Sequence, residues 1–318
     1  MTRLEITPFA DEHLDGAAIL LAERHRVHRA WSPLLDASYE QRAAAREAIE
    51  REWRQKGASG AAALQDGTLA GYLIAAPQPG EAWGANVLVG SAGAGAAAGR
   101  PETIRDLYGA AAQRWVDEGR HRHYALIPAG PAEWLDAWWR LSFGCQQVHG
   151  IQTVGETAWP DGTRVATMDD IDGMLRLGHA IDDVHSRSPV FSTRPAPTEQ
   201  ELRDELAKDV ASPDIGLLVA DVDGRIGGVF EVAPVELSST HTGPARPAGQ
   251  CLLSFAATLP EVRGAGVGAA LTTACMAWAH TAGYTTMVTD WRATNLLASR
   301  FWPARFDPAF LRLYRSVP

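Results

Sequence analysis

The chain of 318 residues repeats itself once, and this repeat limits it to folds that can be built twice in tandem. At an offset of 157 positions, Leu14–Gly16 aligns with Ile171–Gly173, and each segment opens an amphipathic stretch. Asp66–Gly67 aligns with Asp223–Gly224, and each pair lies between two apolar runs, as in a tight β-hairpin. The shared order of these matches favours a duplicated domain.

Farther along the chain the offset becomes 163, which loop insertions explain. Trp115 then aligns with Trp278, and the segment WWRLSF at 138–143 aligns with FWPARF at 301–306. The length of the chain also suits two domains of roughly 150 residues.

The elements predicted for the second copy give the fold class. Strands are expected at 164–167, 216–221, 227–232, 251–259 and 285–289, and helices at 171–181, 199–208, 266–282 and 296–303. This order indicates an α/β (α+β) class in which each copy is a mixed, mostly antiparallel sheet flanked by helices. The connector between the two copies is expected at 150–164, which predicts domains at 1–155 and 156–318. Residues 238–249 are expected to form a mobile loop.

Composition excludes several classes of partner. The net charge is −9 and Lys and Arg are not clustered, which argues against nucleic acid. Three cysteines without CxxC spacing argue against a disulfide framework or a metal site, and indicate a reducing compartment. With no apolar run of roughly 18 residues and no signal core, we expect a cytoplasmic protein that does not contact membranes. We also expect it to be a monomer or a homodimer.

The segment from Cys251 to Leu259 is apolar, and it is followed by a Pro-containing turn and a Gly-rich start of an Ala-rich helix. The first amides of a helix have no partner within it, so they can hold a phosphate group. Gly264, Gly266 and Gly268 would leave these amides uncovered, and Arg263 would add a positive charge. A Gly-rich helix start without a ligand is the alternative, because this pattern alone is weak. The P-loop and dinucleotide-binding patterns are not matched.

This segment resembles the signature of the GNAT superfamily of N-acetyltransferases, Arg/Gln-x-x-Gly-x-Gly/Ala after the fourth strand, here at Arg263–Gly268. A second family feature follows: the strand TTMVTDW, then Asn295, Ala298 and the pair Phe301–Trp302. The resemblance covers the second copy well, and the first copy in outline.

The resemblance implies acetyl-CoA as co-substrate, without a metal. Its pyrophosphate would lie on the amides of Arg263, Gly264, Ala265, Gly266, Val267, Gly268 and Ala269. Its pantetheine would follow the strand through Thr258, the backbone of Leu259 would polarise the thioester carbonyl, and Asn295 would contact the coenzyme arm. Trp302 stands where many members carry a tyrosine that protonates the leaving sulfur, and an indole cannot replace that acid.

The general base is not determined by the sequence. Some family members use a glutamate on the fourth strand, which has no carboxylate here. Glu231 and Asp290 are the candidate catalytic residues, and a water path to solvent is the alternative. His185, Trp291 and Arg292 are candidates for the acceptor side, where His185 could also act as a base. Each has an ordinary explanation as a loop or packing residue.

The first copy lacks the motif. Gly99–Leu107 stands at the position of the Gly-rich turn, where Pro101 has no N–H and Glu102 and Asp106 would repel phosphate. We therefore expect a degenerate first domain that does not bind acyl-CoA, and a second domain that acetylates a primary amine of a small molecule. A protein or peptide N-acetyltransferase, a non-catalytic acyl-CoA sensor and a different acyl donor remain alternatives.

Overall fold

The computed structural model describes residues 4–80, 83–192, 197–246 and 249–318. The chain divides into two compact units that are not continuous segments. Unit 1 is composed of Met1–His149, His241–Ala248 and Pro308–Pro318, and unit 2 of Gly150–Thr240 and Gly249–Asp307. The main boundary therefore follows His149, and two later segments return to unit 1.

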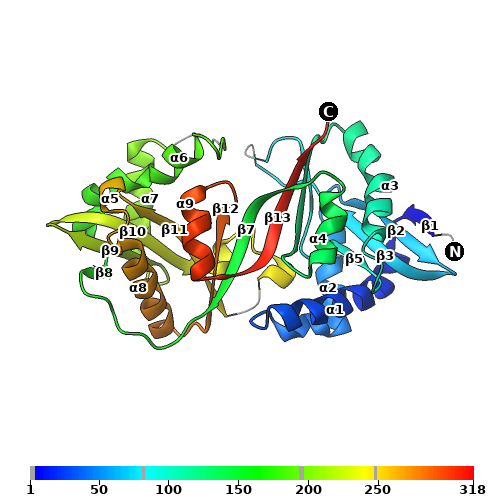
Figure 1. The fold of residues 1–318 in the computed structure, drawn as a ribbon, viewed down its shortest axis with the longest axis horizontal. Helices are drawn as coiled ribbons and strands as arrows, with labels where there is room; N and C mark the ends of the chain where they lie inside the picture. The colour runs from blue at the N-terminus through cyan, green and yellow to red at the C-terminus, as the bar shows by residue number, and fades with distance from the viewer. Residues whose placement is uncertain (1–3, 81–82, 193–196, 247–248) are drawn as a thin grey trace. The chain divides into compact units, whose positions relative to one another are not determined.

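Unit 1 contains most of the first copy, and its elements are labelled in Figure 1. Its elements are β1 (Glu5–Pro8), α1 (Leu14–Trp31), α2 (Arg42–Trp53), β2 (Ser59–Gln65), β3 (Thr68–Ala75), β4 (Asn86–Val89), β5 (Ala94–Ala96), α3 (Thr103–Asp117), β6 (Arg122–Pro128), α4 (Ala132–Trp139), the start of β7 (Gly144–Thr153) and most of β13 (Asp307–Ser316). The strands β1-β2-β3-β5 form an antiparallel sheet, while β6 pairs in parallel with β4 and antiparallel with β13.

Alternate side chains of β3 bury two different sets of helices. Tyr72 and Ile74 pack with the apolar side chains of α1 and α2, whereas Leu73 and Ala75 pack with those of α3. Successive residues of a strand point to opposite faces of a sheet. The helices therefore cover both faces of this sheet.

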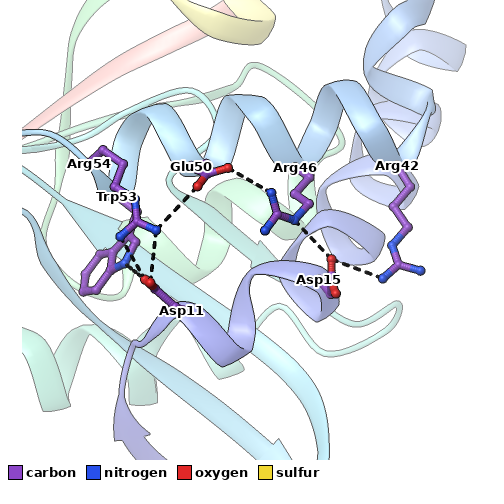
Figure 2. Close-up of polar contacts among 7 residues, drawn as sticks. All are labelled: Asp11, Asp15, Arg42, Arg46, Glu50, Trp53 and Arg54. Atoms are coloured by element: carbon purple, nitrogen blue, oxygen red, sulfur yellow. Dashed lines mark hydrogen bonds and ion pairs between the residues drawn. The ribbon is translucent and has the colours of Figure 1, made fainter.

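The helices α1 and α2 are also joined at the surface by charged side chains (Figure 2). Asp15 of α1 accepts from Arg46 of α2 at 3.2 Å, and Arg54 binds both oxygens of Asp11 at 3.0 Å. The Arg54 and Trp53 hydrogen bonds lower the pKa of Asp11. Because these groups are exposed, the contacts add little to stability.

Unit 2 repeats the arrangement. Its elements are the end of β7, β8 (Thr163–Val165), α5 (Ile171–Gly178), α6 (Ala180–His185), α7 (Glu199–Ala211), β9 (Gly216–Val222), β10 (Arg225–Pro234), β11 (Gln250–Thr258), α8 (Val267–Thr281), β12 (Thr286–Arg292) and α9 (Leu296–Phe301). The strand order is β7-β12-β11-β10-β9-β8, with β11 and β12 parallel and β8 to β11 antiparallel.

Helices cover both faces of this sheet too. Val229 of β10 packs with apolar side chains of α5 and α7. The opposite face of the sheet packs against α8. Gly228, the neighbour of Val229 on β10, points to that face, and a Cβ on Gly228 would lie 2.7 Å from Leu271 of α8. The predicted fold class, a mixed and mostly antiparallel sheet flanked by helices in each copy, is confirmed. One predicted helix, 171–181, is two helices, α5 and α6.

Equivalent residues make equivalent contacts in the two copies. A Cβ on Gly16 would lie 3.0 Å from Leu69, and a Cβ on Gly173 would lie 2.9 Å from Ile226. Leu69 and Ile226 are themselves 157 residues apart. The close approach of helix to strand explains why glycine occupies this place in both copies.

The two hairpin turns are also alike. Asp66 and Gly67 have φ values of 50° and 75°, and Asp223 and Gly224 have values of 50° and 77°. Two consecutive left-handed residues are typical of a type I′ turn, which Asp-Gly favours. The duplication inferred from the sequence is therefore visible in backbone geometry.

Each copy ends in a ten-residue strand that sequence reasoning missed. These strands, β7 and β13, begin at Gly144 and Asp307, again 163 residues apart. From Pro308 onward β13 belongs to unit 1, where Phe310 pairs with Pro128 of β6. The end of β7 belongs to unit 2, beside β12. The final strands are thus exchanged between the copies.

The segment predicted as a mobile loop at 238–249 is packed over much of its described length. His241 and Ala245 are buried, and Ser91 Oγ donates to the carbonyl of Thr242 at 2.7 Å. These contacts place this connection between β10 and β11 in unit 1. Residues 247–248 lie outside the described part. No helix in the described part of the chain is both long and apolar enough to cross a membrane.

Candidate functional site

Unit 2 contains a cavity of about 440 Å³ between α6, β11, the start of α8 and α9. It is lined by Ala180, Ile181, Val184, Phe230, Ala256, Ala257, Thr258, Val262, Arg263, Gly264, Gly266, Val267, Gly268, Ala269, Asn295, Leu297, Ala298, Phe301, Trp302 and Arg305. The cavity therefore brings the two predicted signature segments together.

The cavity exists because two parallel strands separate. Leu253 of β11 and Thr289 of β12 form the last pair of their ladder, although both strands continue beyond it. Opposite β10, Glu231 faces Phe255 and Val232 faces Leu253, so Ser254 is the extra residue of a β-bulge. The bulge thus marks the point where the strands part.

The backbone of β11 beyond the bulge is directed alternately to β10 and to the cavity. The amide of Leu259 donates to Gly227 of β10 at 2.9 Å, and its carbonyl accepts from Val262 at 3.2 Å. Because backbone direction alternates along a strand, Ala256 and Thr258 turn their polar groups the other way, toward the cavity. The expectation that the Leu259 backbone polarises a carbonyl conflicts with these bonds, and buried Leu259 is outside the described cavity lining.

The Gly-rich turn owes its glycines mainly to backbone conformation. Gly264 and Gly266 have φ values of +84° and +86°, which L-residues rarely adopt. Among the described residues, nothing lies within 4 Å of a Cβ built on either. At Gly268 the reason is space, because a Cβ would lie 3.3 Å from the Phe301 ring. The expected role of these glycines, to avoid obstructing a ligand, is therefore only part of the explanation.

The start of α8 offers hydrogen-bond donors to an anion. Gly266 is its N-cap, and the amide of Ala270 donates to Gly266 at 3.0 Å, which begins the helical ladder. The amides of Val267, Gly268 and Ala269 precede that ladder, so a ligand can accept from them. Ala265 lies outside the described lining, and its amide donates to Val262 at 3.3 Å.

Two guanidinium groups border the cavity. Arg263 is exposed beside the turn. Arg305 lies 3.7 Å above the centre of the Phe301 ring, and its Nη1 donates to the carbonyl of Phe301 at 2.8 Å. Sequence reasoning assigned no role to Arg305. Its position four residues after Phe301, within the second signature, was a usable signal for a cation packed on that aromatic ring.

Asn295 and Trp302, both predicted to bind the coenzyme, line the cavity, and each also has a structural role. The Oδ1 of Asn295 accepts from the amides of Leu297 and Ala298 at 3.2 and 3.3 Å, which caps α9. Trp302 is buried and its ring centre lies 6.0 Å from that of Phe230. It forms an apolar wall.

Glu231 lies at the bulge, on the face of β10 that α5 and α7 cover, and outside the described cavity lining. Ser254 Oγ donates to its Oε1 at 2.5 Å. Burial raises the pKa of Glu231, the Ser254 hydrogen bond opposes this, and Asp209 and Glu205 raise it further. A carboxylate of raised pKa beside the point where strands part is suited to accept a proton.

The remaining predicted residues lie around the cavity rather than in its described lining. Asp290 follows Thr289, so it stands across the gap from Ser254. Trp291 is buried, with its ring within 2.8 Å of a Cβ built on Gly150. Arg292 Nη2 donates to Ser192 Oγ at 3.0 Å, and His185, the last residue of α6, accepts from Ser192 N at 2.8 Å through its carbonyl. Arg292 and His185 therefore both hydrogen-bond to Ser192, in the segment that follows α6.

In the first copy, the equivalent backbone amides are already hydrogen-bonded within their own turn. The amides of Thr103, Ile104 and Arg105, which open α3, donate to Arg100, Pro101 and Glu102 at 3.1, 3.1 and 2.9 Å. Its fourth strand is broken into β4 and β5, where the second copy has a one-residue bulge.

A smaller cavity of about 110 Å³ remains at the corresponding place in unit 1. It lies beside β5 and the start of α3, and Trp134, Trp138 and Glu133 of α4 border it. Among the described residues, no group of three His, Cys, Asp or Glu side chains is placed to hold a metal ion.

Comparisons with known proteins agree with this geometry. The sequence model of the Acetyltransferase (GNAT) family matches residues 180–306. No curated protein matches the sequence.

Among solved structures, a GCN5-related N-acetyltransferase from Sphaerobacter thermophilus is 13% identical with a TM-score of 0.55, over 98% of this chain and 95% of that one. A GCN5-related glucosamine N-acetyltransferase region of a fungal multi-domain GH3 β-N-acetylglucosaminidase is 13% identical with a TM-score of 0.51, over 99% of this chain and 38% of that one. A tandem GNAT protein from the clavulanic acid biosynthesis pathway is 16% identical with a TM-score of 0.49, over 99% of both chains.

At these identities the first two structures establish the fold of the whole chain, whereas the family match concerns the second copy. The match spans α6 to α9, and so includes every element that lines the larger cavity. The chain therefore has the fold of these GCN5-related N-acetyltransferases over its whole length, and residues 180–306 match the GNAT family of acetyltransferases.

Proposed function

We propose that unit 2 is an N-acetyltransferase that transfers the acetyl group of acetyl-CoA to a primary amine of a small molecule. The observation that carries this proposal is the cavity itself, which leads from the free amides of α8 along the parted strand β11. The match of residues 180–306 to the GNAT family of acetyltransferases supports the acyl-transfer chemistry.

The residues of the cavity fit the coenzyme by type. The amides of Val267, Gly268 and Ala269 would hold the pyrophosphate, with Arg263 and Arg305 supplying positive charge. The backbone of Ala256 and Thr258 would bind the amide groups of the pantetheine, as a neighbouring strand would. When bound, acetyl-CoA supplies the thioester that the amine attacks.

Glu231 is the base in this proposal. An ammonium ion must lose a proton before it can attack, and Glu231 has a raised pKa at the bulge. Asp290, across the gap, is the second candidate. Trp302 supplies no acid, so the CoA sulfur would leave as a thiolate, which is tolerable near neutral pH.

A small acceptor is favoured over a protein acceptor by one comparison. The fungal region of the same fold is named a glucosamine N-acetyltransferase, an enzyme for a small amine. The chain's own charge of −9 suits a cationic acceptor.

Release of CoA thiol from acetyl-CoA, measured with a panel of primary amines, tests the proposal. We expect release that depends on an amine and saturates with it. Saturable binding of acetyl-CoA without release for any amine would instead identify a non-catalytic acyl-CoA sensor, and would contradict the enzyme.

A further inference from the structure

The base proposed above accepts a hydrogen bond from an exposed hydroxyl group. Glu231 is partly buried, whereas Ser254 is exposed. Ser254 Oγ donates to Glu231 Oε1 at 2.5 Å and lies 3.3 Å from the backbone carbonyl of the same residue. An acceptor arriving from solvent would therefore meet the serine before the carboxylate.

The bulge explains why this hydroxyl is available. Ser254 is the extra residue between the pairs Glu231–Phe255 and Val232–Leu253. A bulge re-aims the side chain that it inserts, and bulges are frequent beside active sites. Ser254 also follows Leu253, whose pair with Thr289 is the last between β11 and β12. The hydroxyl thus stands where β11 and β12 part, two residues before Ala256, the first residue of β11 in the described cavity lining.

We propose that Ser254 is a catalytic residue that passes the proton of the acceptor amine to Glu231. This inference rests on the proposed function. As the nitrogen forms its bond to the acetyl carbon, an N–H bond breaks and its proton binds Ser254 Oγ. The original hydroxyl proton of Ser254 moves to Glu231 Oε1, which becomes a neutral carboxylic acid. The electron pair of the C–S bond leaves with the sulfur.

The charged groups around Glu231 suit this role. From α7, Glu205 and Asp209 face the carboxylate and raise its pKa, in addition to burial, while the Ser254 hydroxyl on β11 lowers it. In the wild type the pKa of Glu231 would set the acidic limb of the rate profile, along which the base loses its proton.

Four variants of the full-length chain test the relay: Ser254→Ala, Ser254→Thr, Glu231→Gln and the double variant of Ser254→Ala with Glu231→Gln. Thiol release with an amine accepted by the wild type is measured against pH. Ser186→Ala is the matched control, because Ser186 is an exposed serine of unit 2 whose hydroxyl donates to the Asp183 carbonyl at 3.1 Å. Acetyl-CoA affinity reports whether each variant is folded.

We expect Ser254→Ala and Glu231→Gln each to lower kcat by about 100-fold with unchanged acetyl-CoA affinity. The double variant should be no slower than the slower single variant, because both changes remove one proton path. Ser254→Thr should recover most of the rate. Because the path to Glu231 is then cut, the residual activity of Ser254→Ala should no longer show the acidic limb that the pKa of Glu231 sets in the wild type.

Two results would overturn the relay: wild-type rates in Ser254→Ala, or a double variant whose loss is the product of the two single losses. Failure of the proposed function can be told apart from failure of the relay, because the wild-type chain would then release no thiol with any amine. That outcome would remove the reaction that the relay serves.

Discussion

At the scale of single residues, the turn before α8 shows how backbone conformation produces the proposed coenzyme site. Gly264 and Gly266 reverse the chain with positive φ, and this reversal directs the amides of Val267 to Ala269 away from the helix. The site therefore depends on two glycines that need not touch the ligand.

Gly266→Ala tests this dependence, with Gly283→Ala as control. Gly283 follows the other end of α8, also has a φ of +86°, and likewise has no described atom within 4 Å of a built Cβ. Each alanine should lower the free energy of unfolding by roughly 1–2 kcal/mol, because a left-handed residue with a Cβ is strained. Chemical denaturation measures this loss.

Acetyl-CoA affinity should separate the two variants. Gly266→Ala should weaken it by about tenfold to 100-fold, since the amides of the turn lose their alignment with the pyrophosphate. Gly283→Ala should leave it unchanged. Equal affinities in the two variants would mean that the turn does not bind the coenzyme.

The same turn shows which residues were predictable. Its glycines and Arg263 are adjacent in sequence, so the site could be predicted from one short segment. Ser254 could not, because a bulge arises from the register between β10 and β11 and leaves no mark in the sequence. The proposed partner of Glu231 was therefore missed, although Glu231 itself was a candidate.

At the scale of elements, the exchanged strands are the feature that sequence reasoning did not provide. Local patterns predicted most strands and helices of the second copy within a few residues. They could not show that β13 pairs with β6, because that contact joins residues about 180 positions apart, such as Phe310 and Pro128. Predicted domains at 1–155 and 156–318 also separate β13 from this partner.

The exchange predicts that the segment 156–318 does not fold alone. It would lose the end of β7 beside β12, including Gly150, against which Trp291 packs, and β13 would lack β6. Circular dichroism of the isolated segment should show no cooperative unfolding. Co-expression with 1–155 should restore it, because both sets of paired strands are then present. Cooperative unfolding of the isolated segment would contradict the exchange.

At the scale of the whole molecule, one fold occurs twice with different outcomes. In unit 2 the strands β11 and β12 part beside a cavity of about 440 Å³, and the start of α8 has free amides. In unit 1 the first amides of α3 are bonded to their own turn, and the cavity is about 110 Å³. We infer that the second copy binds the coenzyme and the first copy has a structural role.

Calorimetric titration of the full-length chain with acetyl-CoA tests this division most directly. We predict saturable binding of one molecule per chain, which Gly266→Ala weakens. Two bound molecules per chain would contradict the degeneracy of the first copy. No binding by the folded chain would contradict the coenzyme site at α8, and with it the acetyltransferase.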